Sequence, residues 1–258
     1  MLFILELISI GFLTGAITGM TGASGVLVVV PFLATITDLP LQAILGASLL
    51  VDVIASISIS YTYAHNKHLD AKKAVWLLAG SLLGAQAGSF FVVGFSKLFI
   101  IVAIVLCMLF FGVNMWRSGA TKKAPRFITL PEDWAVYLKK PLAMIILGFL
   151  IGLSTGLFGA GGGLIIFIIL FSFLRMPIKT AIGTSTFIML LTALSGVIGY
   201  IEYNNFDFKN GLIIGAAAAV GGIFSANFAN RVRDDILARL IGIFFIALAL
   251  IMIAFKVL

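Results

Sequence analysis

The sequence has little charge. Only 10% of its 258 residues are Asp, Glu, Lys or Arg, whereas 62% are hydrophobic. In a soluble domain about a quarter of the residues are charged. This chain has too few charged residues to cover the surface of a soluble protein of its length. The composition therefore excludes a soluble enzyme, a nucleic-acid-binding module and a disordered protein. It predicts an integral membrane protein in contact with the lipid bilayer.

Cysteine and histidine are also scarce. The single cysteine, Cys107, lies in an apolar run, where we expect a small buried hydrophobe. The two histidines, His65 and His68, flank Lys67 in a loop and are expected to be solvated. The sequence has no calcium, zinc, Walker-type or dinucleotide-binding motif. We therefore expect no metal site, no cofactor, no catalytic residue and no nucleic-acid partner.

Long apolar runs account for most of the chain. A membrane-spanning helix needs about 20 apolar residues, and six runs meet this length, at about 41–64, 74–95, 97–116, 180–201, 210–229 and 237–256. Two further runs, about 2–37 and 141–174, are too long for one crossing of a hydrocarbon core about 30 Å thick. Glycine clusters interrupt both, at GMTGASG and at GLFGAGGG. We expect each to be a broken hairpin, with one helix in, a glycine turn and a shorter helix back.

The two halves of the sequence repeat each other. The polar stretch 117–140 separates a first membrane repeat, 1–116, from a second, 141–258. At a constant offset of 137 residues the halves align without a gap, and the matches include prolines, serines and aspartates. They include Gly11 with Gly148, Pro40 with Pro177, Ser48 with Ser185, Tyr63 with Tyr200 and Asp70 with Asp207. This alignment indicates an internal duplication.

The basic residues favour one of two topologies. If each half crosses the membrane four times the repeats are parallel, whereas a hairpin followed by three crossings makes them inverted. Lys and Arg gather on the cytoplasmic side of membrane proteins. With the linker inside, the inverted arrangement places 14 of them inside and 3 outside, and the parallel one 11 and 6. The predicted fold is an all-α integral membrane protein with an inverted internal repeat, each half a glycine-broken helical hairpin followed by three transmembrane helices, and both termini outside.

The glycine turns are the first candidate binding site. A broken helix exposes N–H groups and a partial positive charge at its N-terminus, which attracts anions, and inverted-repeat transporters bind substrate at such ends. The alternative is that the glycines permit close helix packing, which we expect for the ladder of Gly11, Gly15 and Gly19. The candidate substrate-binding residues are Thr21, Gly22, Ala23, Ser24 and Gly25 in the first half and Phe158, Gly159, Ala160, Gly161, Gly162 and Gly163 in the second.

Hydroxyl groups form a second candidate element. With Pro40 and Pro177 in the first turns of their helices, Ser48 and Ser185 lie about 12 Å in, near the bilayer midplane. In an inverted repeat the two serines can meet there and, with Thr184, offer hydroxyls to a polar ligand. The alternative is that each serine bonds back to a carbonyl of its own helix.

Asp52 is the only acid expected deep in a span. It lies one turn beyond Ser48, and its repeat partner is Met189. An acid at such depth is costly, so it is a functional candidate by default. We expect Asp52 to carry a proton in coupled transport; the alternative is a neutral Asp that is hydrogen-bonded between helices.

These motifs resemble the TauE/SafE family of sulfite exporters, which is related to the toluene-sulfonate uptake permeases. The resemblance covers essentially the whole chain. The second copy, GLSTGLFGAGGG followed by MPIKTAIGTS, matches more closely than the first, in which Ser24 interrupts the glycines and Ala47 replaces the threonine. The resemblance implies transport of sulfite, sulfonates, sulfoacetate or related organic anions across the bacterial cytoplasmic membrane. The residues alone indicate a small anion or polar solute.

Together these features predict a secondary transporter of a small sulfur-containing anion, with proton coupling through Asp52. An anion channel that uses the same helix ends stays open as an alternative. An intramembrane enzyme is disfavoured because the predicted spans contain no histidine, cysteine pair or acid pair.

Overall fold

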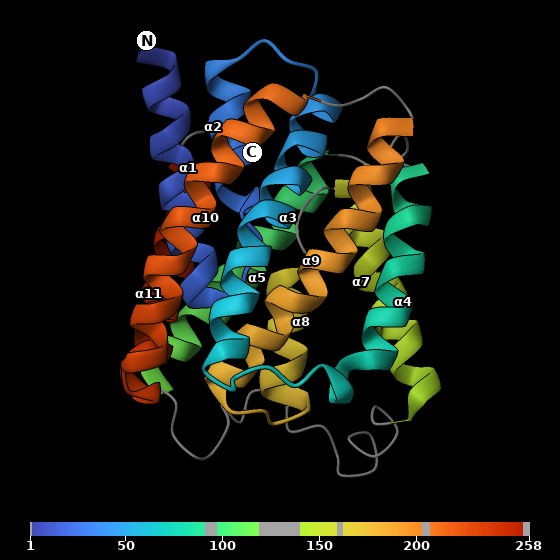
Figure 1. Ribbon diagram of the computed structural model, residues 1–258, viewed down its shortest axis with the longest axis vertical. Coiled ribbons are helices and arrows are strands. Elements are labelled where there is room, and N and C mark those ends of the chain that lie inside the picture. Colours follow the sequence, from blue (N-terminus) through green and yellow to red (C-terminus); the bar gives the residue numbers. More distant parts are fainter. Residues whose placement is uncertain (1, 91–96, 119–139, 159–161, 203–206, 255–258) are drawn as a thin grey trace.

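The computed structural model describes residues 2–90, 97–118, 140–158, 162–202 and 207–254, and within these ranges it contains helices and no strand (Figure 1). The all-α prediction is therefore confirmed. The first half contains α1 (Leu2–Thr21), α2 (Val26–Ile36), α3 (Leu41–His65), α4 (Ala71–Phe90) and α5 (Lys97–Ser118). The second contains α7 (Pro141–Phe158), α8 (Gly163–Ile168), a π-helical segment η2 (Ile169–Phe173), α9 (Ile178–Glu202), α10 (Phe208–Arg231) and α11 (Asp234–Ala254).

Four of the described helices are long and apolar enough to cross a membrane. They cover Phe3–Thr21, Gln42–His65, Ile178–Ile201 and Phe208–Arg231, and shorter apolar helices cover Ala74–Phe90, Pro141–Gly156 and Gly163–Ser172. Many large apolar side chains are exposed on the outer faces of these helices, as at Leu83 and Phe224. So much exposed apolar surface suits lipid rather than water, and the chain is a multi-pass membrane protein.

Both long apolar runs contain the predicted break. In the first, α1 ends at Thr21, Gly22 has a φ of +67°, and α2 begins at Val26. A positive φ favours glycine, which accounts for a glycine at the break between α1 and α2. In the second run α7 ends at Phe158 and α8 begins at Gly163.

Helices of one half pack against helices of the other. α1 lies along α10, α7 along α4, α3 along α9 and α5 along α11 (Figure 1). The 137-residue offset relates α1 to α7, α10 to α4, α3 to α9 and α5 to α11. The offset therefore relates the pair of α1 and α10 to the pair of α7 and α4. It relates the pairs α3–α9 and α5–α11 to themselves.

The central pair, α3 and α9, is antiparallel. Gly196 faces Leu49, whereas Gly183 faces Tyr63, so residue numbers rise along one helix as they fall along the other. In Figure 1, α3 descends toward its connection with α4, and α9 rises from that same end.

Glycines let the outer pairs approach closely. A Cβ atom at Gly15 would overlap the carbonyl oxygen of Ala218 on α10, and one at Gly152 would overlap that of Ser81 on α4. Small residues at these positions permit close contact between helices in a membrane. The packing role predicted for the glycine ladder of α1 is thereby confirmed.

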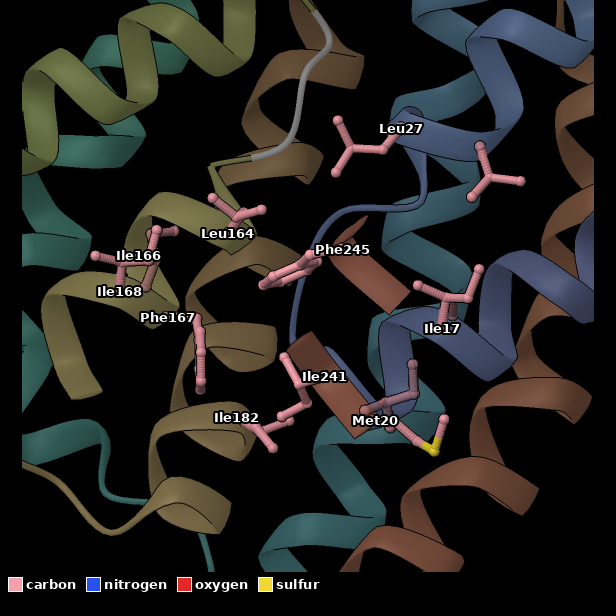
Figure 2. Packing of buried hydrophobic residues seen from close by; sticks show 14 of the residues in the cluster. Ile17, Met20, Leu27, Leu164, Ile166, Phe167, Ile168, Ile182, Ile241 and Phe245 are labelled. Atoms are coloured by element: carbon pink, nitrogen blue, oxygen red, sulfur yellow. The ribbon is translucent and has the colours of Figure 1, made fainter. Parts of the chain in front are cut away.

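The apolar core surrounds the ends of the two hairpins. Figure 2 shows Ile241 and Phe245 of α11 gathered with Met20 of α1 and with Leu164 and Phe167 of α8. All five side chains are buried. The glycine loops are thus enclosed by apolar side chains from both halves.

Candidate functional site

The two glycine loops lie against each other inside the protein. A Cβ atom at Gly163 would lie 2.7 Å from the carbonyl oxygen of Gly22 and 3.0 Å from the amide nitrogen of Ser24. Gly22, Ser24 and Gly163 are all buried. The structure therefore brings together the described parts of the two predicted loops.

Local hydrogen bonds hold the first loop. The Thr21 hydroxyl donates to the carbonyl oxygen of Ile17 at 2.8 Å and accepts from the N–H of Ala23 at 3.0 Å. The next residue, Gly22, lies so close to α9 that a Cβ there would be 2.5 Å from the Ser185 Oγ. Thr21 and Ala23 thus shape the turn, and Gly22 places it against α9.

Asp52 occupies the N-terminus of α2. The N–H of Gly25 donates to its Oδ1 at 2.7 Å, and the Ser24 hydroxyl donates to its Oδ2. The Ser24 oxygen also accepts from the N–H of Val26 at 3.2 Å. Asp52 is only 1% exposed. Two of the donors that the sequence offers to an external anion are therefore engaged by a carboxyl group of the chain itself.

The second half has a methionine where the first has this acid. Met189, the repeat partner of Asp52, lies so close to α8 that a Cβ at Gly163 would be 2.5 Å from its Sδ. The N–H of Gly162 donates instead to the Thr155 Oγ1 at 3.0 Å. The N–H groups of Gly25 and Gly162, at equivalent positions in the two halves, therefore differ in what accepts their hydrogen bonds.

This difference leaves one hydroxyl without a partner. Thr18 is the repeat partner of Thr155. The N–H of Gly25 donates to Asp52 and not to Thr18, and the Thr18 Oγ1 has no hydrogen-bond partner in the described part of the chain. Thr18 is 1% exposed, and its Oγ1 lies 3.7 Å from the position of a Cβ at Gly25. A buried hydroxyl without a partner is costly, and this one faces the start of α2.

The two serines bond to their own helices. Ser48 donates to the carbonyl oxygen of Leu45 at 2.7 Å and Ser185 to that of Ile182 at 2.9 Å, as the alternative interpretation predicts. Ser185 additionally lies 3.5 Å from the carbonyl oxygen of Gly22. Ser185 therefore touches the first loop.

The prediction that the serines meet is wrong. The pairing of Leu49 with Gly196 and of Tyr63 with Gly183 puts Ser48 level with about residue 197, roughly 18 Å along the axis from Ser185. The reason is helix length: α3 has 25 residues, so its middle is near Asp52 rather than Ser48. Pro40 also precedes α3 as its N-cap instead of lying in the first turn, and α9 likewise begins at Ile178, after Pro177.

Of the remaining predicted site residues, some lie in described helices and the others lie outside the described residues. The Thr184 hydroxyl accepts from the N–H of Asp70 at 3.0 Å and so supports the connection between α3 and α4. Phe158 ends α7, whereas Gly159, Ala160 and Gly161 lie outside the described residues. In the ranges that the structure describes, no group of three or more His, Cys, Asp or Glu residues could hold a metal ion.

A polar cluster missed by the sequence analysis joins three connections at one end of the bundle. The Nδ1 of His68 lies 2.6 Å from the Asn230 Oδ1, so this histidine is bonded rather than simply solvated. Lys179 donates to the Asn230 carbonyl oxygen at 3.0 Å and lies 3.5 Å from Asp234. His68 and Asn230 are 162 residues apart, and no local pattern could pair them.

A shallow groove lies elsewhere, between α3 and α10. Its volume is about 440 Å³, and its lining includes Tyr61, His65 and Asn227. None of the predicted site residues lines it.

Comparison with known proteins places the chain in a family. A family model described as "Sulfite exporter TauE/SafE" matches residues 7–252. The chain is 25% identical over 252 residues to the probable membrane transporter protein YunE of Bacillus subtilis, covering 92% of each protein. It is 37% identical to YdhB of the same organism over 113 residues, 43% of this chain and 46% of that protein. It is 29% identical to a probable membrane transporter protein of Haemophilus influenzae, over 77% of this chain and 74% of that one.

No solved structure matches the chain. The family match, in contrast, spans both hairpins and every described helix that packs around them. The chain therefore belongs to the sulfite exporter TauE/SafE family, whose members similar to it are named as membrane transporters.

Proposed function

We propose that the protein is a secondary transporter, not an enzyme, that moves a small sulfur-containing anion across the bacterial cytoplasmic membrane. The observation that carries this proposal is the contact between the two glycine loops at Gly22, Ser24 and Gly163. Glycine lets the main chain approach a ligand closely, and helix N-termini favour negative charge. The family name supports an anion of the sulfite, sulfonate or sulfoacetate type.

The anion site lies between the loops Thr21–Gly25 and Phe158–Gly163. Main-chain N–H groups hold the anion, and Ser185, which touches the first loop, adds its hydroxyl. Ser48 and Thr184 offer further hydroxyls. Because Ser48 and Ser185 are roughly 18 Å apart along their helices, one small anion contacts them at different stages of its passage rather than together.

The two halves are inverted repeats. Two observations support this: the antiparallel course of α3 and α9, and the exchange of packing partners between the halves. The connection from α3 to α4, the start of α9 and the turn from α10 to α11 share one end of the bundle in Figure 1. Basic residues near that end, such as Lys72, Lys179 and Arg233, support a cytoplasmic position for it, with both termini outside.

Transport requires the two hairpins to separate. The backbones of the loops approach so closely at Gly163 that an anion can enter only when α1 and α2 move relative to α7 and α8. Movement of one part of an inverted-repeat bundle against the other gives alternating access. The close contact therefore favours a transporter over a channel, because a channel needs a continuous path.

Binding is tested by thermal unfolding of the purified protein with sulfite, thiosulfate, sulfoacetate, isethionate and sulfate. We expect at least one anion to raise the unfolding temperature of the wild type. The Ser185→Ala variant should lose this shift, whereas Ser9→Ala, which removes an exposed hydroxyl on α1, should keep it. If no anion shifts the wild type, or if Ser185→Ala responds as the wild type does, this site is not where an anion binds.

A further inference from the structure

We infer that the carboxyl group of Asp52 occupies the place of the transported anion at the N-terminus of α2, and that each anion bound there displaces it together with the uptake of one proton. This inference rests on the proposed anion transport and states how the same site is regulated.

The donors at the N-terminus of α2 are already used. Gly25 donates its N–H to one oxygen of Asp52, and Ser24 donates its hydroxyl to the other. Both oxygens of one carboxyl group are thus held at the start of a helix, where negative charge is favoured. An external anion can use these donors only after Asp52 has left them.

The Thr18 hydroxyl lies beside the same helix N-terminus. It is buried, it faces Gly25, and it has no hydrogen-bond partner among the described residues. Its repeat partner Thr155 accepts from the N–H of Gly162, in the half where no acid intervenes. Once Asp52 has left, the Thr18 hydroxyl, the Ser24 hydroxyl and the Gly25 N–H surround one position, as three donors for an oxyanion.

Charge balance limits what can bind beside Asp52. Asp52 is the only charged residue among the buried side chains of the described chain. On the helices packed around it, the described charged side chains lie near the helix ends: Glu6 on α1, Lys179 on α9, and Lys209 and Arg231 on α10. The other buried titratable side chain of α3, Tyr63, donates to the carbonyl oxygen of Gly19. No cation is therefore available to offset a second negative charge beside Asp52.

A proton from solvent meets this need. It bonds to a carboxylate oxygen of Asp52 as the anion enters, and it returns to solvent when the anion leaves and the carboxylate resumes its hydrogen bonds. For a monovalent anion the charge of the site is then the same before and after binding. Coupled transport is electroneutral, with one proton for each monovalent anion.

The second half contains the matching control. Met189 is an uncharged side chain that fits at this depth beside a glycine loop. The Asp52→Met variant copies that arrangement, and Asp52→Asn keeps the shape of the acid without its charge. In both variants the N-terminus of α2 has lost its internal anion.

The experiment is isothermal titration of the purified protein with the five anions of the panel, in buffers of different ionisation enthalpy. The comparison yields the number of protons taken up per anion bound. The Asp52→Asn variant corrects for protons exchanged by the anion itself, and Glu6→Gln, which changes an exposed acid, is the matched control. We expect the wild type and Glu6→Gln to take up about one proton more than Asp52→Asn, and Asp52→Met to bind at least about tenfold tighter at alkaline pH.

The outcomes separate this inference from the proposed function. Anion binding by the wild type with no more proton uptake than in Asp52→Asn overturns the inference and leaves transport standing. If neither the wild type nor any Asp52 variant binds an anion, both the inference and the proposed function fail. If the Asp52 variants do not fold, the number of protons that the wild type and Glu6→Gln each take up with the non-titrating isethionate still decides: a number near zero in both proteins overturns the inference.

Discussion

Tyr63 and Tyr200 occupy equivalent positions, 137 residues apart, and make the same hydrogen bond. The Tyr63 hydroxyl donates to the carbonyl oxygen of Gly19 at 2.8 Å, and the Tyr200 hydroxyl donates to that of Gly156 at 3.1 Å. In each case the donor comes from the long central helix and the acceptor from the last turns of the hairpin's first helix. Both rings are buried. The tyrosines thus tie each hairpin to the central pair of helices.

We expect Tyr63→Phe and Tyr200→Phe each to lower the free energy of unfolding by about 1 kcal/mol, because each leaves a buried carbonyl oxygen without its donor. Thermal unfolding in detergent measures the effect. Tyr61→Phe is the control, since Tyr61 lies on α3 but is 73% exposed. Equal stability of all three variants would show that the tyrosine hydroxyls do not hold the hairpins.

Thr18 and Thr155 should respond oppositely to the same substitution. Thr155→Val removes the acceptor for the N–H of Gly162 and should cost about 1 kcal/mol, whereas Thr18→Val removes a hydroxyl without a partner and should leave stability unchanged or raise it. Thr18→Val should nevertheless weaken anion binding. The same loss of stability in both variants would contradict the account of the Thr18 hydroxyl.

Close packing of α1 on α10 should make Gly15 intolerant of any side chain. A Cβ there meets main-chain atoms of Ala218, which cannot turn aside, so Gly15→Ala should cost about 3 kcal/mol or prevent folding. Gly196→Ala is the matched control, because a Cβ there meets only the end of the flexible Leu49 side chain. The yield of folded protein and its unfolding temperature measure both. A Gly15→Ala protein as stable as Gly196→Ala would mean that the two helices are not in such close contact.

The orientation of the bundle is tested by cysteine labelling in a Cys107→Ser background. Lys72 and Lys209 are both exposed but lie at opposite ends. We expect Lys72→Cys to react with a membrane-impermeant maleimide only from the cytoplasmic side, and Lys209→Cys only from outside. Labelling of both from one side would rule out the inverted arrangement.

The sequence predicted most of the architecture, because its strongest signals are local. Apolar runs about 20 residues long located the single spans: for α3, α5, α9, α10 and α11 the predicted bounds agree with the structure to within three residues. The glycine clusters located the breaks, since a residue such as Gly22 at φ +67° is where glycine is favoured. The gap-free offset located the repeat.

Contacts between distant segments could not be predicted in the same way. That Asp52 lies at the start of α2 depends on how α3 approaches the loop, and Ser24 is 28 residues away in sequence. The prediction that Ser48 meets Ser185 failed because the depth of each serine was counted from the start of its own helix. The positions at which α3 and α9 contact each other, which the sequence does not reveal, decide which residues are level. The acid itself was recognisable from its depth, but its partners were not.

The central claim is that the protein carries an anion across the membrane, and its most direct test is uptake of radiolabelled sulfite into proteoliposomes with an imposed pH gradient. We predict saturable uptake above that of protein-free liposomes, driven by the gradient, and uptake no longer driven by the gradient in Asp52→Asn. Uptake no faster than in empty liposomes, with sulfite and with the other four anions alike, would contradict the account.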